Sequence, residues 1–177
     1  MAATRVISVI GKKNAGKTTL VVALVQEYVR RGRRVGTIKH GHHPAIVDQE
    51  GKDTWRHFHE GGVIRTLLES PGQRVVFERI AETADPQALV RAHFLDTDIV
   101  VVEGFKRSPL PKIEVHRKSE HSTPLFDLSR TEPGDWIAMV TDDRTLRLPC
   151  PVFNFTDTAW FTSLAHLAWE RALVIEG

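Results

Sequence analysis

Residues 6–19 read VISVIGKKNAGKTT. Four of the first five are apolar and β-branched, which favours a short buried strand. Gly11–Thr18 then fits the pattern G-x-x-x-x-G-K-[ST] without a mismatch. Glycines let such a loop curl until its N–H groups converge on an anion, and the helix that follows adds the positive end of its dipole. The stretch predicts a phosphate-binding loop made of Gly11, Lys12, Lys13, Asn14, Ala15, Gly16, Lys17, Thr18 and the adjoining Thr19.

The elements around this loop predict a parallel α/β sheet. Apolar residues recur at helical spacing over Thr18–Arg31, Gly32 is a natural stop, and Val35–Lys39 is predicted to be a second strand. Strand, helix and strand in this order form a βαβ unit. Ile99–Val102 has four consecutive β-branched residues, which indicates a strand buried on both faces. We expect a P-loop NTPase-like, doubly wound, mostly parallel sheet with helices on both faces, in a single nucleotide-binding domain over residues 1–177.

Turn signals and periodicity place further elements along the chain. Four more strands are predicted at Val63–Leu68, Val75–Ile80, Lys112–His116 and Trp136–Val140. Three helices are predicted at Asp53–Glu60, Asp85–Phe94 and from a cap at Asp157 to Ala172. The long loop that begins at residue 40 has no periodicity, and its length indicates a functional role.

Composition limits the classes of partner. Hydrophobic residues make up 41% and charged residues 26% of the chain, which is typical of a globular protein. The 24 Lys and Arg nearly balance the 22 Asp and Glu, so no overall field favours nucleic acid or a membrane surface. Cys150 is the only cysteine, which excludes an intramolecular disulfide. With no signal-peptide pattern and no apolar run near ~20 residues, we expect a cytoplasmic protein with no nucleic-acid and no membrane partner.

The loop motif assigns chemistry to individual side chains. Lys17 is expected to reach the β- and γ-phosphates of a nucleotide, and the Thr18 hydroxyl to ligate Mg²⁺. The apolar strand at 99–102 delivers Glu103 to its carboxyl end, where open α/β sheets bind ligands. A carboxylate at that point ligates Mg²⁺ directly or through water. Lys17 and Glu103 are therefore predicted catalytic residues, and Thr18 and Glu103 predicted metal ligands.

Further blocks of sequence carry a resemblance to one family. They are TIKHGHH at 37–43, Asp48, GKDT at 51–54, VEGFK at 102–106 and PKIE at 111–114. Together with the phosphate loop, they closely resemble the molybdopterin-guanine dinucleotide biosynthesis adaptor proteins, the MobB family. The resemblance covers the chain from about Arg5 to Glu114.

The resemblance implies a GTP-binding protein with weak GTPase activity and Mg²⁺ as cofactor. Such proteins assist the molybdopterin guanylyltransferase, which attaches GMP to molybdopterin, or deliver the finished cofactor to apo-molybdoenzymes, and they are typically homodimers. Molybdopterin or its guanine dinucleotide is then a further ligand. When the family's site residues are carried over by position, Gly11–Thr18 bind phosphate and Glu103 ligates the metal. Lys39–His43 and Asp48–Asp53 line the site.

Residue chemistry leaves several roles in the loop after the second strand open. Lys39 is a cation at the ligand-binding edge of the sheet, where it suits phosphates. His40 and the two histidines that follow match no standard zinc spacing, and either contact with phosphate or pterin or simple solvation fits them. Asp48 is the third predicted catalytic residue, expected to orient a water or to support Mg²⁺ from outside its ligand shell. Asp53 has the same interpretation, or that of a helix N-cap.

A standard N-K-x-D guanine motif is absent. Thr141-Asp142-Asp143 follows a predicted strand, at a point where a carboxylate that accepts hydrogen bonds from guanine N1 and N2 would reject adenine. Asp142 is the predicted acceptor, and a simple turn formed by the aspartate pair is the alternative. Asn154 and Asp157 are further candidates for contact with the base.

Other functions fit the same loop motif. A small-molecule kinase needs a lid that carries arginines, and Arg117, Arg130 and Arg144 lie in predicted loops. A partition-type ATPase has a lysine where Lys12 stands, but usually continues with two glycines in place of Lys13-Asn14. A third alternative binds GTP as a structural ligand without hydrolysing it. For the GTP-binding adaptor we expect slow hydrolysis, because the sequence identifies no arginine finger and no water-positioning Gln.

Overall fold

The computed structural model describes residues 3–41, 48–127 and 135–177. These residues form two compact units, one from the N-terminus to His40 together with 85–177, and the other over 41–84. The first is called the main unit and the second the hairpin unit. The expectation of one domain over residues 1–177 stays a prediction.

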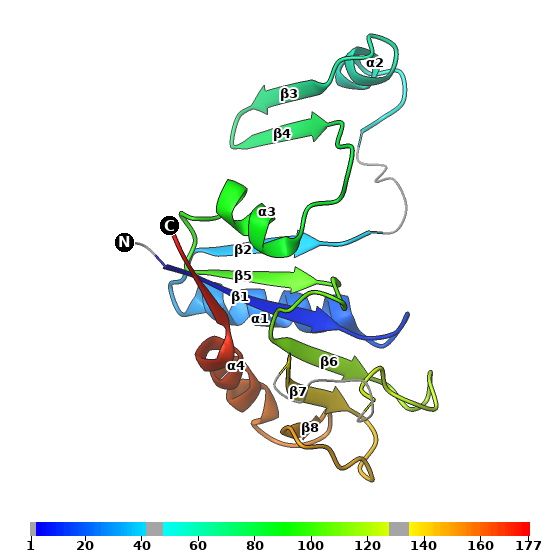
Figure 1. The fold of residues 1–177 in the computed structure, drawn as a ribbon, viewed down its shortest axis with the longest axis vertical. Coiled ribbons are helices and arrows are strands. Elements are labelled where there is room, and N and C mark those ends of the chain that lie inside the picture. The colour runs from blue at the N-terminus through cyan, green and yellow to red at the C-terminus, as the bar shows by residue number, and fades with distance from the viewer. Residues whose placement is uncertain (1–2, 42–47, 128–134) are drawn as a thin grey trace. The chain divides into compact units, whose positions relative to one another are not determined.

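The main unit is built on a seven-stranded sheet (Figure 1). The order is β2-β5-β1-β6-β7-β8, all neighbours along this path are parallel, and β9 runs antiparallel beside the N-terminal half of β1. The strands are β1 Ala3–Ile10, β2 Val35–Lys39, β5 Ile99–Glu103, β6 Lys112–His116, β7 Trp136–Thr141, β8 Val152–Asn154 and β9 Leu173–Glu176. The prediction of a mostly parallel sheet is confirmed.

Helices cover both faces of this sheet. They are α1 Lys17–Arg30, α3 Pro86–His93 and α4 Trp160–Arg171. Successive side chains of a strand point to opposite faces. Ile7 and Val9 of β1 therefore pack with α1 and α4 in one apolar cluster, whereas Val6 packs with Val90 of α3 in another. This arrangement confirms the predicted doubly wound α/β fold.

α1 carries the phosphate loop at its N-terminal end, so its position matters for the site. Leu20, Leu24 and Tyr28 are spaced four residues apart and are buried against the sheet. The Tyr28 hydroxyl donates a hydrogen bond to the Ala165 carbonyl of α4 at 2.9 Å, and burial raises the pKa of Tyr28. The helix ends before Gly32, whose φ of +73° lies in the left-handed region. Packing and this one hydrogen bond fix α1 relative to α4.

Two predicted helix caps are wrong. Asp157 does not cap the last helix, because the Asn154 side chain first accepts a hydrogen bond from Thr156 N and forms a turn that delays the start of α4 until Trp160. Asp157 forms an ion pair with Arg144 instead. Asp53 lies in the first turn of α2, where a carboxylate complements the helix dipole, and Lys52 holds the cap position.

The hairpin unit contains one helix and one β-hairpin. α2 spans Asp53–His59, and β3 (Arg65–Ser70) pairs antiparallel with β4 (Gln73–Glu78). The turn at Gly72, with φ +80°, joins the strands directly, so they lie closer to the turn than the predicted ranges 63–68 and 75–80. Within the described part of this unit, no third strand pairs with the hairpin. Over both units, no described helix is both long and apolar enough to cross a membrane.

Candidate functional site

The phosphate loop is a tight curl between β1 and α1. Gly11, Asn14 and Gly16 all have positive φ, at +152°, +62° and +100°. The Lys17 ammonium turns back over the loop and donates a hydrogen bond to the Lys12 carbonyl at 2.7 Å. The positive φ values show the curled backbone that the glycines of the motif predict, and the binding of an anion by its N–H groups stays a prediction.

Glu103 stands beside the loop at the carboxyl end of β5. The Thr18 hydroxyl donates to its two carboxylate oxygens at 2.9 and 3.1 Å, and the Lys39 ammonium lies 3.2 Å from Oε1. Glu103 is only 9% exposed, and in the sheet it is level with Val9 of β1 and Lys39 of β2. Thr18, Glu103 and Lys39 therefore meet at one point of the sheet edge, although they are far apart in the sequence.

The charges at this point favour a polyanion. Lys17 and Lys39 carry two positive charges against the single carboxylate of Glu103. Burial lowers the pKa of Lys17, Glu103 opposes this shift, and Lys39 adds to it. Phosphate oxygens would restore charge balance to a lysine that has lost part of its hydration. The carboxylate and the Thr18 hydroxyl are both oxygen ligands, which is the donor set that Mg²⁺ takes beside nucleotide phosphates.

His40 supports the strand that bears Glu103. Its backbone N–H donates to the Glu103 carbonyl at 2.9 Å, and its ring lies 4.4 Å from that of Phe105. Gly104 has a φ of +101°, and a Cβ at this position would lie 3.1 Å from the Cβ of His40. The glycine and phenylalanine of the VEGFK block therefore let His40 pack closely behind the acid.

The segment that directly follows β6, described over residues 117–127, contacts the phosphate loop. The sequence predicted it only as a loop. The Lys12 ammonium donates to the Thr123 carbonyl at 2.7 Å and lies 3.2 Å from its hydroxyl oxygen. The His121 ring nitrogen lies 2.6 Å from the Lys13 carbonyl. In this structure Lys12 is thus engaged by its own chain, which gives no support to the partition-ATPase hypothesis.

Arg117 belongs to the same segment and lies against the loop. One guanidinium nitrogen is 3.7 Å from where a Cβ on Gly16 would be, and the guanidinium stacks over the Phe155 ring at 5.1 Å. The sequence placed Arg117 only among loop arginines. Its position directly after the predicted strand at 112–116 was the signal available in the sequence, because ligands bind at the carboxyl ends of parallel strands.

Buried charges in β6 hold this segment in place. Glu114 is 1% exposed and accepts hydrogen bonds from the N–H groups of Leu125 and Phe126 and from Trp136 Nε1. Burial raises the pKa of Glu114, and these donors oppose the shift. All five residues of β6 are buried, so its polar and apolar alternation marks internal partners and not a solvent face.

The predicted guanine acceptor is engaged by the protein itself. Asp142 accepts a hydrogen bond from Lys118 N at 2.6 Å; burial alone would raise the pKa of Asp142, but N–H donors including Lys118 lower it below its ordinary value. The Thr145 hydroxyl and N–H, with Lys118, lower the pKa of Asp143 to about 2. Both carboxylates thus accept hydrogen bonds that stabilise turns, which is the alternative that the sequence left open.

The remaining predicted residues lie in the hairpin unit, on α1 or outside the described residues. Asp48 lies in the hairpin unit, where its Oδ1 accepts a hydrogen bond from Gln49 N and its buried Oδ2 has no hydrogen-bond partner within the described part of the chain. Thr19 is exposed on α1. The histidines at 42 and 43, and Arg130, lie outside the described residues. Among the residues that are described, no group of three or more His, Cys, Asp or Glu is placed to hold a metal ion without other ligands.

Comparison with known proteins identifies the family. The model of a family described as molybdopterin guanine dinucleotide synthesis protein B matches residues 6–142. The chain belongs to the MobB family. Its relatives include the molybdopterin-guanine dinucleotide biosynthesis adapter protein of Haemophilus influenzae, 40% identical over 126 residues that cover 69% of this chain and 68% of the relative. A Bacillus subtilis protein, named as a probable adapter of the same kind, is 30% identical over 159 residues and 86% of both chains.

Solved structures agree with this membership. The crystal structure of Bacillus subtilis MobB superposes with a TM-score of 0.71 over 96% of this chain and 98% of that one, at 24% identity. A MobB homolog from Bacillus stearothermophilus gives a TM-score of 0.65 over 92% and 97%, at 25% identity. The MobB fold is therefore shared over nearly the whole chain, including the part beyond residue 142.

Proposed function

We propose that this MobB-family protein binds GTP with Mg²⁺ at the phosphate loop and acts as an adapter in molybdopterin-guanine dinucleotide biosynthesis. The observation that supports the nucleotide is the convergence of Thr18, Glu103 and Lys39 beside a curled loop that carries Lys17. The adapter role rests on the names of the relatives. Its partners would be the molybdopterin guanylyltransferase, apo-molybdoenzymes or both, with the pterin or its dinucleotide as the cargo.

Each residue has a distinct task in this proposal. The backbone of residues 11–18 and the Lys17 ammonium bind the β- and γ-phosphates. Thr18 and Glu103 hold Mg²⁺, and their present hydrogen bond keeps both side chains at the metal position. Lys39 now forms an ion pair with Glu103. It would turn to the phosphates when Mg²⁺ binds that carboxylate. Hydrolysis to GDP and phosphate is proposed to be slow, as the family resemblance implies, so the bound nucleotide would mark a state of the adapter.

Calorimetric titration with GTP and with ATP, each with Mg²⁺ and with EDTA, tests this proposal. We expect GTP to bind at least about tenfold more tightly than ATP, since a base that leaves polar groups unpaired is rejected. Removal of Mg²⁺ should weaken GTP binding by about tenfold or more, because Glu103 would then face the phosphates without a cation between them. Tighter binding of ATP would contradict the proposal and favour a kinase or a partition-type ATPase.

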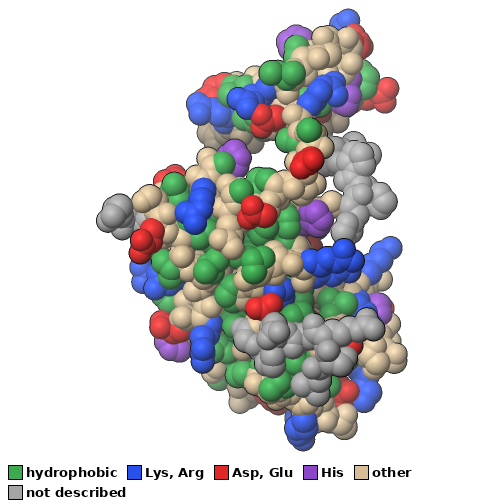
Figure 2. Space-filling model, viewed as in Figure 1, with side chains coloured by type: hydrophobic (Ala, Val, Ile, Leu, Met, Phe, Trp, Pro, Cys, Tyr) green, Lys and Arg blue, Asp and Glu red, His purple; other side chains and the backbone are tan. Residues whose placement is uncertain are grey.

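We also propose that the chain forms a homodimer through the hairpin unit. One face of the hairpin carries Leu67 opposite Val76, and these side chains are 53% and 49% exposed. Ion pairs between Arg65 and Glu78 and between Arg74 and Glu69 border this apolar pair. Ile64 and Ile80, just beyond the strands, are 80% and 67% exposed, and Figure 2 shows hydrophobic side chains among charged ones on the surface of this unit. A two-stranded hairpin is marginal in water, and a second copy would cover it.

Val76→Lys should shift the protein from dimer to monomer. A lysine in the apolar pair would be buried in the dimer while the bordering carboxylates of Glu69 and Glu78 are already paired with arginines, which costs several kcal/mol. Val22→Lys is the matched control, because Val22 is equally exposed, at 49%, but lies on α1 of the main unit. Sedimentation equilibrium at micromolar concentration measures the oligomeric state of both variants. A wild-type protein that is monomeric, or a Val76→Lys variant that remains dimeric, would rule out this interface.

A further inference from the structure

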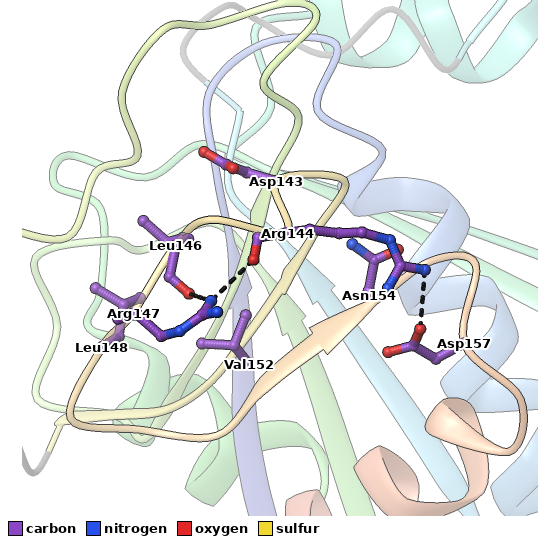
Figure 3. Close-up of a pocket in the computed structure, with 8 residues that line it drawn as sticks. All are labelled: Asp143, Arg144, Leu146, Arg147, Leu148, Val152, Asn154 and Asp157. Atoms are coloured by element: carbon purple, nitrogen blue, oxygen red, sulfur yellow. Dashed lines mark hydrogen bonds and ion pairs between the residues drawn. The ribbon is translucent and has the colours of Figure 1, made fainter.

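A polar cavity of about 310 Å³ opens beside the carboxyl ends of β7 and β8 (Figure 3). This is at the low end of the range for small-molecule sites. Leu146, Leu148 and Val152 supply apolar wall, and Arg144, Asn154 and Asp157 supply most of the polar groups. The residues that line it run from 143 to 157, so they all lie outside the range 6–142 that the family model matches.

One buried group in this cavity has an unused donor. Asn154 is 7% exposed, and its Oδ1 accepts hydrogen bonds from the backbone N–H of Thr156 at 3.1 Å and from its hydroxyl at 2.7 Å. Because a backbone N–H can only donate, the bond from Thr156 N fixes which side-chain atom is oxygen and which is nitrogen. Nδ2 is buried and has no hydrogen-bond partner among the residues that the structure describes. Figure 3 shows Asn154 rising from β8 beneath the Arg144 side chain. A buried amide without a partner is costly, so a ligand acceptor at this point would recover the lost interaction.

The charge on the lining selects the kind of ligand. Arg144 and Arg147 carry two positive charges, and Asp143 and Asp157 carry two negative ones, so the cavity favours a neutral polar molecule over a phosphate. Arg144 pairs with Asp157 at 3.1 Å, but both side chains are about half exposed or more, and an exposed pair of this kind is weak enough to exchange for a ligand. The apolar wall suits the flat face of a ring. A planar heterocycle that offers an acceptor to Asn154 and donors to Asp157 fits all these groups.

From this geometry we infer that the cavity binds the 2-amino-4-oxopyrimidine edge that guanine and pterins share. Asn154 Nδ2 donates to the ring carbonyl, and the Asp157 carboxylate accepts from the ring N–H and the exocyclic amine. The inference rests on the proposed function and deepens it, because it assigns base selection to residues 154 and 157 and not to Asp142. β8 lies three strand positions from β1, or about 14 Å at the usual spacing, which an extended nucleotide anchored at the phosphate loop spans.

Asn154→Asp tests the donor without disturbing the turn. The variant keeps the oxygen that accepts from Thr156 and replaces the amide nitrogen with an acceptor. We expect GTP affinity to fall at least tenfold, because the ring carbonyl would then face an acceptor in place of a donor. Asp157→Asn should bring the affinities for GTP and ITP to within threefold, because ITP lacks the exocyclic amine. Gln26→Glu is the control, because it makes the same change from amide to acid at an exposed position of α1. It should change neither the affinity for GTP nor the ratio of the affinities for GTP and ITP.

A pterin titration separates the two sources of this chemistry. If the cavity holds the guanine of the nucleotide, 6-carboxypterin should compete with GTP. If it holds a pterin, 6-carboxypterin should bind the GTP-loaded protein, and Asn154→Asp should weaken this binding while GTP affinity stays the same. Both results support the inference. A wild-type protein that does not bind GTP at all would refute the proposed function. GTP binding with an unchanged GTP-to-ATP ratio in Asn154→Asp, and no pterin effect of that variant, would refute this inference alone.

Discussion

Lys17→Ala is expected to weaken GTP binding by about 100-fold while leaving the folded protein intact. The Lys17 ammonium now bonds the Lys12 carbonyl at 2.7 Å, so it is already poised over the loop where phosphates would bind. Hydrogen bonds to charged groups contribute about 1.5–3 kcal/mol each, and 1.4 kcal/mol is a tenfold change in affinity. Burial lowers the pKa of Lys17, so removal of this partly desolvated charge should cost little stability without nucleotide.

Lys13→Ala is the matched control for this prediction. Lys13 is exposed in the same loop, and only its backbone carbonyl is engaged, by His121. Calorimetric titration with GTP measures affinity, and the melting temperature without nucleotide measures stability. If Lys13→Ala lost as much affinity as Lys17→Ala, net charge and not a directed contact would explain the effect. If Lys17→Ala bound GTP normally, the phosphate-loop assignment would be wrong.

Gly11→Ala is expected both to destabilise the fold and to abolish nucleotide binding. A Cβ on Gly11 would lie 2.4 Å from the Val115 carbonyl oxygen, which is backbone of β6 and has no rotamer by which to move away. The φ of +152° adds strain that L-residues rarely tolerate. We expect a loss of about 3 kcal/mol or more in the free energy of unfolding, in the range of severe core overpacking. The loop would have to leave β6, and its N–H groups would no longer converge on a phosphate.

Gly32→Ala separates strain from collision. Gly32 has a φ of +73°, but nothing lies within 4 Å of a Cβ there, so only the left-handed backbone is penalised, by roughly 1–2 kcal/mol. Urea unfolding of both variants, followed by GTP titration, makes the comparison. Equal loss of stability in the two variants, with GTP binding retained in Gly11→Ala, would show that the contact between the loop and β6 has no role in forming the site.

The segment after β6 links the stability of the core to the shape of the phosphate loop. Glu114 accepts three hydrogen bonds inside the main unit, two of them from backbone N–H groups of residues 125 and 126. The carbonyl of Thr123, just before these residues, accepts a hydrogen bond from the Lys12 ammonium. The loop is therefore held by α1 on one side and by an anchored segment on the other, which keeps the backbone nest in shape before any ligand binds.

The sequence by itself determined the parallel sheet, the phosphate loop and the acid that faces it. These features follow from local pattern, since a β-branched run followed by G-x-x-x-x-G-K-[ST] allows few backbone shapes, and the residue after a buried strand lies at the ligand edge. Lys17, Thr18 and Glu103 were all assigned on that basis. The structure brings the Thr18 hydroxyl and the Glu103 carboxylate within hydrogen-bond distance.

Tertiary structure alone decided which other polar side chains have partners. In the sequence, Asp142 and Asp143 are free carboxylates at a strand end; in the fold, Lys118 and Thr145 donate to them. Asn154 was one of several polar residues near the last helix, and only three-dimensional packing leaves its Nδ2 buried with no partner in the described parts of the chain. The reason is that hydrogen-bond satisfaction depends on groups distant in the chain, whereas periodicity and loop motifs depend on neighbours. Local pattern thus predicted where phosphates would bind, and long-range packing pointed to the place where a base would bind.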